Sequence, residues 1–156
     1  MTEAKFTQED HALAMTCAVE IEIDARPGVI WNLLTDAVGF PRWNSTVTGI
    51  DGEIRDGARI RLHVPGTRRT FTPRVSIAQP GRLMTWSDGF DPLFKGVRVF
   101  EVRERGGAAS EFRMRERFSG VAFALLRRSM PDFGPIFTAY ANDLRREAER
   151  TAHSTN

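Results

Sequence analysis

The chain has 156 residues, of which 41% are apolar and 27% are charged, as is usual for one globular domain with a single core. The 22 lysines and arginines nearly balance the 20 aspartates and glutamates, and a net charge of +2 offers no basic field for nucleic acid. The single cysteine, Cys17, excludes an intrachain disulfide, and we expect it to be a buried structural thiol.

The N-terminal residues are polar and acidic, and no apolar run in the sequence is long enough to cross a bilayer. We therefore expect a cytoplasmic protein without a transmembrane segment. Residues 1–14 are predicted to form a flexible tail, residues 15–150 a single domain, and residues 151–156 a frayed end.

Residues 19–44 have the pattern of a strand, a turn, a helix and an aromatic loop. Apolar and acidic residues alternate from Val19 to Ile23, which is the period of a strand with one buried face. Pro27 suits the first turn of a helix, because the N–H that proline lacks would have no partner there. A second short helical turn is predicted just before Trp43.

Residues 47–118 are a series of strand patterns separated by turn signals such as Asp51-Gly52 and Gly106-Gly107. Their spacing predicts roughly six successive strands in an antiparallel meander. Arginines that alternate with apolar residues, such as Arg113 and Arg115, are expected to form a solvated strand face rather than a phosphate-binding stripe.

A long helix is predicted to end the domain, from about residue 130 to about residue 150. Apolar residues recur along it at steps of three and four, while charged residues occupy the remaining positions. This pattern indicates an amphipathic helix that lies on the sheet. The apolar stripe consists of Phe133, Phe137, Tyr140, Leu144 and Ala148.

Two charged residues, Arg98 and Glu116, stand in otherwise apolar strand registers. A carboxylate with apolar neighbours can act as an acid or a base, and an arginine beside it can polarise a carbonyl or bind a ligand carboxylate. The plainer interpretation is that the two side chains pair with each other, because buried charges are usually paired. Tyr140 can likewise either donate a hydrogen bond to a ligand or fill the core.

The order of these elements, together with several motifs, resembles the SRPBCC superfamily of START-like and pollen-allergen-like helix-grip proteins. Within it, the chain is most similar to the polyketide cyclase/dehydrase-like family. The motifs are IEIDARPGVIWNLLTD at residues 21–36, FPRWN at 40–44, GEIRDGARIRL at 52–62, LMTW at 83–86, GVRVFEV at 96–102 and FRMRERFSG at 112–120.

The resemblance implies an α+β helix-grip fold, in which a curved antiparallel sheet of about seven strands wraps around the long C-terminal helix and two short helices follow the first strand. It also implies an elongated apolar cavity that binds a small hydrophobic ligand of lipid, polyketide or aromatic type. The candidate cavity residues are Trp43, Asn44, Phe71, Trp86, Arg98, Phe100, Met114, Glu116, Phe133, Phe137 and Tyr140.

No cofactor and no metal are expected, because the three histidines His11, His63 and His153 are far apart in the sequence and nucleotide-binding and metalloprotease motifs are absent from it. Three functions stay open: a binding protein for a hydrophobic ligand, a cyclase or dehydratase that uses Glu116, Arg98 and Tyr140, and a protein-interaction module. The third rests on residues 118–130, whose apolar content suits a partner site, a lid or a homodimer contact.

Overall fold

The computed structural model describes residues 3–154 of the chain. The elements in chain order are β1 (Lys5–His11), β2 (Ala14–Ile23), α1 (Pro27–Thr35), α2 (Phe40–Trp43), β3 (Gly49–Asp51), β4 (Arg61–His63), β5 (Thr70–Phe71), β6 (Arg74–Gln79), β7 (Leu83–Phe90), β8 (Phe94–Glu104), β9 (Ser110–Ser119), α3 (Val121–Leu126), the 3-10 turn η1 (Arg127–Ser129) and α4 (Phe133–Ser154).

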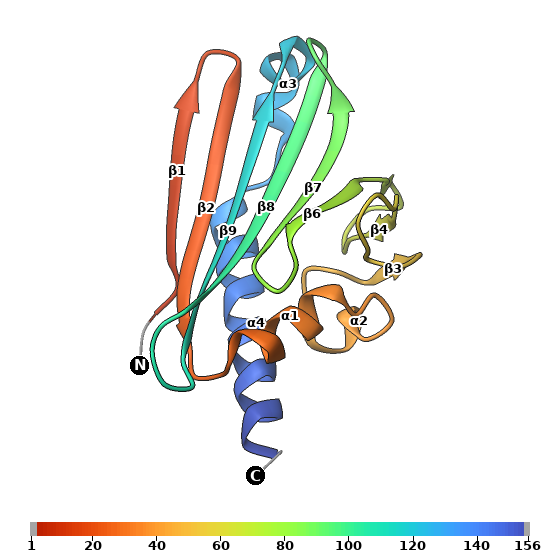
Figure 1. The fold of residues 1–156 in the computed structure, drawn as a ribbon. Helices are drawn as coiled ribbons and strands as arrows, with labels where there is room; N and C mark the ends of the chain where they lie inside the picture. Colours follow the sequence, from red (N-terminus) through yellow and green to blue (C-terminus); the bar gives the residue numbers. More distant parts are fainter. Residues whose placement is uncertain (1–2, 155–156) are drawn as a thin grey trace.

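A six-stranded antiparallel sheet in the order β1-β2-β9-β8-β7-β6 forms the body of the molecule, and α4 lies along its inner face (Figure 1). The strands β3, β4 and β5 make a separate small sheet beside it. The predicted helix-grip architecture is confirmed, although the expected strands are divided between these two sheets.

The register of the large sheet places apolar side chains in rows on its inner face. Val19 pairs with Met114, Met114 with Phe100, and Phe100 with Met84, and all four side chains are buried. Side chains alternate between the two faces of a strand, so the neighbouring positions face outward. The alternation seen in the sequence therefore defines which face of the sheet is covered by α4.

The first helices form as the sequence predicts. Pro27 occupies the first turn of α1, which buries Ile30 and Leu34, and Pro41 occupies the first turn of α2. Both helices lie between the lower part of α4 and the small sheet in Figure 1. They cover the end of the core that the large sheet leaves open.

Two predictions about the chain ends are wrong for the part of the chain described. The expected tail of residues 1–14 contains β1, which pairs with β2 along its whole length. Only Phe6 of β1 is half-buried, so the strand is held by backbone hydrogen bonds at the sheet edge and lacks an apolar pattern in the sequence. Helix α4 continues to Ser154, beyond the expected end at residue 150, while residues 1, 2, 155 and 156 lie outside the described part.

None of the helices within residues 3–154 combines the length and the apolar character that crossing a bilayer requires.

Candidate functional site

An ion pair between neighbouring strands marks the centre of the inner face. Arg98 of β8 and Glu116 of β9 stand directly opposite each other in the sheet. Nη2 and Nε of Arg98 both donate to Oε2 of Glu116, at 2.7 and 3.1 Å. Each side chain is only 15% exposed. The structure thus confirms that the two charges predicted in apolar register pair with each other.

The arginine of this pair also lies against two aromatic rings of α4. Its Cζ is 5.4 Å from the centroid of the Phe137 ring and 5.7 Å from that of Tyr140. Burial lowers the pKa of Arg98, but the charge and hydrogen bonds of Glu116 outweigh this effect and the net shift is upward. Arg98 therefore remains a fixed cation in the interior.

Buried donor groups without a partner gather next to this pair. Trp43 Nε1, Trp86 Nε1, Asn44 Nδ2 and the Tyr140 hydroxyl have no hydrogen-bond partner among the side chains and backbone of residues 3–154. Trp43, the most exposed of these four residues, is only 8% exposed. Buried polar groups normally find partners, so four unpaired ones in this interior indicate a site.

The ring of Phe40 joins three of these groups. Its centroid is 4.7 Å from that of Trp43, 6.2 Å from that of Trp86 and 6.1 Å from that of Tyr140. Trp43 comes from α2, Trp86 from β7 and Tyr140 from α4, so the rings around Phe40 come from three elements. We call Phe40, Trp43, Trp86 and Tyr140 the donor cluster.

Tyr140 is a hydrogen-bond donor at any physiological pH. Burial raises the pKa of its hydroxyl well above the ordinary value, and the nearby charge of Arg98 offsets only part of that shift. The proton therefore stays on the oxygen. Within the donor cluster, this hydroxyl and the two indole N–H groups all present hydrogens and no charge.

Hydrogen bonds between α4 and the residues after α2 fix the position of the donor cluster. The backbone N–H and the hydroxyl of Ser45 both donate to Oδ2 of Asp143, at 2.8 and 2.6 Å. Oδ1 of Asn44 accepts from the N–H and the hydroxyl of Thr46. These bonds occupy the oxygen of the Asn44 amide and leave its nitrogen unpaired.

Cys17 stands next to Glu116 in the same row of the sheet and is completely buried. Its Sγ lies 3.9 Å from Oε1 of Gln8. Burial, reinforced by the charge of Glu116, raises the pKa of the thiol from its ordinary 9.0 to about 11. A protonated thiol at this depth is a poor nucleophile, as expected for a structural cysteine.

The predicted cavity residues fall into three groups. Seven are buried between the sheet and the helices, and three others, Arg98, Glu116 and Phe133, are partly exposed at the same interior. Phe71 is 41% exposed on β5 of the small sheet, so its assignment to the interior is wrong. The seven buried residues are Trp43, Asn44, Trp86, Phe100, Met114, Phe137 and Tyr140.

Two central aromatics were not among the predicted site residues. Phe40 is the hub of the donor cluster, and Phe112 stacks on Tyr140 at 6.5 Å with an interplanar angle of 9°. The FPRWN motif contains Phe40, and Phe112 shares the strand face of Met114 and Glu116. Both signals were present in the sequence, but sequence alone did not show that these two rings meet Tyr140.

Aromatic side chains occupy the space where an elongated cavity was expected. Phe40, Phe100 and Tyr140 are completely buried, and the rings of Phe40 and Phe100 each contact that of Tyr140. Two open hollows, of about 570 and 760 Å³, lie elsewhere. The smaller lies by the end of β2 and the turn after β8, and the larger between the turns at the opposite end of the sheet.

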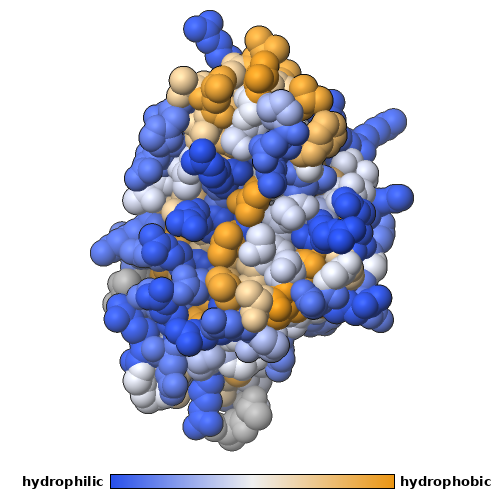
Figure 2. All heavy atoms as spheres, turned by 45° about the horizontal axis from the view of Figure 1, so that its top comes forward, coloured by the Kyte–Doolittle hydropathy of each residue, from blue (hydrophilic) through white to orange (hydrophobic). Residues whose placement is uncertain are grey.

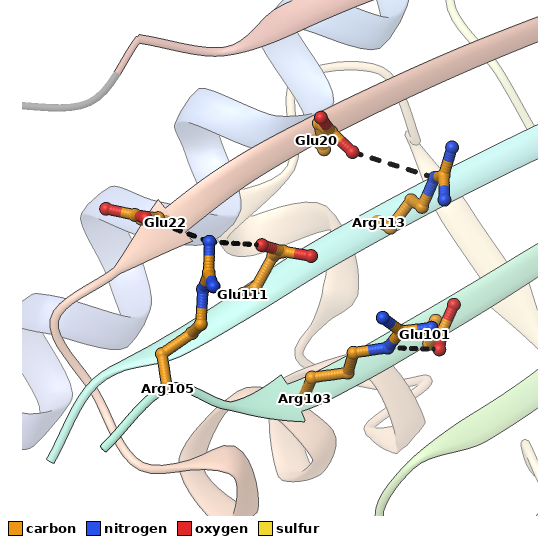
Figure 3. A network of polar contacts seen from close by, with 7 residues as sticks. All are labelled: Glu20, Glu22, Glu101, Arg103, Arg105, Glu111 and Arg113. Atoms are coloured by element: carbon orange, nitrogen blue, oxygen red, sulfur yellow. Dashed lines mark hydrogen bonds and ion pairs between the residues drawn. The ribbon is translucent and has the colours of Figure 1, made fainter. Parts of the chain in front are cut away.

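The outer face of the sheet carries a different kind of ion pair. Arg105 lies 2.9 Å from Glu111 and 3.4 Å from Glu22, and Arg113 lies 3.7 Å from Glu20 (Figure 3). Arg105 and Arg113 are about half exposed, so these contacts are solvated and contribute little stability. The alternating arginines form a solvated strand face, as predicted.

No group of three or more histidine, cysteine, aspartate or glutamate side chains suited to a metal ion occurs within the described part of the chain.

A curved antiparallel sheet closed by a long C-terminal helix defines the class of helix-grip proteins. Residues 15–149 match the family model described as polyketide cyclase / dehydrase and lipid transport, and the chain belongs to this family. No curated protein matches the chain.

Solved structures share the fold at low sequence identity. The aromatase/cyclase ZhuI from Streptomyces sp. R1128 has a TM-score of 0.71 and 16% identity, with 92% of this chain and 98% of that chain covered. A protein from Rhodobacter sphaeroides has a TM-score of 0.67 and 19% identity, covering 99% and 100%. A START superfamily protein from Mycobacterium smegmatis has a TM-score of 0.59 and 16% identity, covering 90% and 99%.

Proposed function

We propose that the protein binds a small hydrophobic molecule with hydrogen-bond acceptor atoms between the sheet and α4. The observation that carries the proposal is the donor cluster, whose indole N–H groups and hydroxyl are buried without partners. A carbonyl oxygen of a ligand has two lone pairs and would accept from up to two of them, and leaving a buried donor unsatisfied costs about 1–3 kcal/mol. The family description and the likeness to an aromatase/cyclase support a ligand of polyketide, aromatic or lipid type.

Binding at this place requires aromatic rings to move apart. Phe40 and Trp43 both belong to α2, a helix of four residues whose exit is held by the bonds of Ser45 to Asp143. Displacement of this short helix would separate Phe40 and Trp43 from Tyr140 without breaking the large sheet. The ligand would then take the place of ring contacts within the donor cluster.

A matched pair of probes tests the proposal. Fluorene and 9-fluorenone share one ring skeleton and differ in a carbonyl oxygen, and their binding can be followed by tryptophan fluorescence and by calorimetry. We expect 9-fluorenone to bind more tightly, by about two- to tenfold for each hydrogen bond gained. Trp86→Phe should reduce that preference by the share of one hydrogen bond, while Trp31→Phe on α1, outside the donor cluster, serves as the control.

Two results would count against it. If neither probe bound the wild-type protein, the interior would not be a ligand site for flat aromatic molecules. If both bound with equal affinity, and Trp86→Phe changed neither, the donor cluster would have no part in recognition.

The largely buried carboxylate of Glu116, in the same interior as the Tyr140 hydroxyl, favours a second candidate, a cofactor-independent cyclase or dehydratase. Glu116 would take a proton from a carbon between two carbonyl groups, and the Tyr140 hydroxyl would donate to the enolate oxygen. Arg98 would hold the carboxylate in place through its two hydrogen bonds. Glu116→Gln should then abolish turnover of a poly-ketone substrate and leave its binding largely intact, whereas unchanged turnover would remove Glu116 from the mechanism.

A further inference from the structure

Large apolar side chains are exposed together at one end of the molecule. They come from three segments that are far apart in the sequence: the turn after β1, the turn between β7 and β8, and α3. Figure 2 shows apolar atoms gathered at this end, where Figure 1 places α3 and the strand turns. The exposed residues, which we call the apolar end, are Leu13, Phe90, Leu93, Val121, Leu125 and Leu126.

Backbone hydrogen bonds hold the three segments in one arrangement. The N–H of Gly120 donates to the carbonyl of Leu13 at 3.0 Å, and the N–H of Ala122 donates to that of Leu93 at 2.8 Å. Arg127 reaches back to the carbonyl of His11, at 2.7 Å. The apolar end is therefore a built surface, and its exposed leucines do not result from a loose loop.

Cations adjoin this surface. The hollow of about 760 Å³ beside the apolar end is lined by Lys95 and Arg117, together with Leu13 and Val121. The one acidic residue lining it, Asp91, lies 3.6 Å from Lys95 and is thereby neutralised.

Two arginines near the apolar end lack an ion pair. Arg117 on β9 and Arg128 in η1 are both exposed, and no acidic side chain within residues 3–154 pairs with either. Arg127, by contrast, is 3.7 Å from Asp10 and stacks over Phe123. Arg117 and Arg128 therefore supply unpaired positive charge near the apolar end.

We infer that the apolar end docks on a bilayer surface that carries anionic phospholipids. Exposed leucine and phenylalanine side chains would enter the boundary between headgroups and acyl chains, and Arg117 and Arg128 would face the anionic headgroups. A second copy of the chain fits less well. A two-fold contact through this end would bring the same unpaired arginines of both copies to one interface.

Vesicle flotation with the full chain tests this inference. Vesicles of phosphatidylcholine alone are compared with vesicles that also contain phosphatidylglycerol. We expect binding to the anionic vesicles, and a loss of about tenfold in Leu125→Asp, because this side chain is 81% exposed and its contact with lipid would disappear. Arg128→Gln should weaken binding by roughly fivefold, the electrostatic contribution of one cation at such a surface.

Val38→Asp is the matched control, since Val38 is 90% exposed in the connection between α1 and α2, away from the apolar end. It should bind like the wild type. Absence of binding to both kinds of vesicle, or an equal loss in Val38→Asp and Leu125→Asp, would overturn the inference. So would a dimer in sedimentation velocity that Leu125→Asp dissociates while vesicle binding is unchanged. None of these outcomes depends on the interior ligand.

Discussion

Replacing Tyr140 by phenylalanine should separate stability from ligand binding. The substitution keeps the ring and its contacts with Phe40 and Phe112, at 6.1 and 6.5 Å, and removes only the hydroxyl. That hydroxyl is completely buried and has no partner in the described part of the chain. An unsatisfied buried hydroxyl costs about 1–3 kcal/mol, so the free energy of unfolding should rise by about 1 kcal/mol or more in Tyr140→Phe.

The same change should weaken the binding of a carbonyl ligand. One neutral hydrogen bond contributes about 0.5–1.5 kcal/mol, which corresponds to about a two- to tenfold loss in affinity for 9-fluorenone and none for fluorene. Urea unfolding followed by tryptophan fluorescence gives the stability, and calorimetry gives the affinity. A loss of stability greater than about 1 kcal/mol would refute the reasoning, because it would mean that the hydroxyl already has a partner in the unliganded protein.

Three further predictions concern single positions. Glu116→Leu should lower the free energy of unfolding by about 3–5 kcal/mol, because Arg98 stays buried without its partner. The double variant Glu116→Leu/Arg98→Met should lose less than about 1 kcal/mol. Urea unfolding compares the two variants, and equal losses would contradict the pairing. The Cys17 thiol has its ordinary pKa of 9.0 in the unfolded chain and a pKa of about 11 in the folded protein. The unfolded chain therefore loses this proton first, and the free energy of unfolding should fall between pH 9 and about 11. Cys17→Ala should lack that part of the fall, about 2–3 kcal/mol, in urea unfolding across this pH range; an unchanged pH profile would show that the thiol is not buried. Gly120→Ala should lower stability by at least about 2 kcal/mol, because φ at this position is +114° and an added Cβ would clash with the carbonyl of Leu93; an unchanged melting temperature would contradict the close approach.

Much of the fold follows from local sequence patterns. The alternation from Val19 to Ile23 predicts a strand with one buried face, and the apolar stripe on α4 predicts a helix that packs on the sheet. The proline at the start of α1 marks where that helix begins. The strand β1 does not follow in this way. Its residues are nearly all exposed, and the pairing of its backbone with β2 holds it in place. Backbone pairing leaves no pattern of side chains in the sequence.

The site residues could be predicted where side chains alternate between the two faces of one strand. The prediction failed where the chain passes from one sheet to the other. Arg98 and Glu116 were placed inside by this alternation, and their pairing follows from the register of β8 and β9. Phe71 is an even number of residues from the buried Val75, so alternation would place both side chains on one face. The chain leaves the small sheet after β5 and enters the large sheet at β6, so the alternation does not continue from Phe71 to Val75. The convergence on Phe40 is long-range, because it brings together α2, β7 and α4.

The polar atoms of the interior are distributed unevenly, and this bears on how a ligand would lie. The donor cluster is on the side of α2, while phenylalanines meet on the side of α3. There the ring centroid of Phe118 is 5.0 Å from that of Phe133 and 6.3 Å from that of Phe123. The pair of Arg98 and Glu116 separates the two sides, since Arg98 contacts the rings of both Phe137 and Tyr140.

A ligand of the proposed kind would therefore direct its carbonyl oxygen toward α2 and its apolar part toward α3. Phe123 is the buried residue of α3, whereas Leu125 of the same helix points to the outside at the apolar end. One helix of six residues thus separates the apolar side of the interior from the surface inferred to meet a bilayer. The two proposals share this boundary but are tested by different residues, because the donor cluster and the apolar end have none in common.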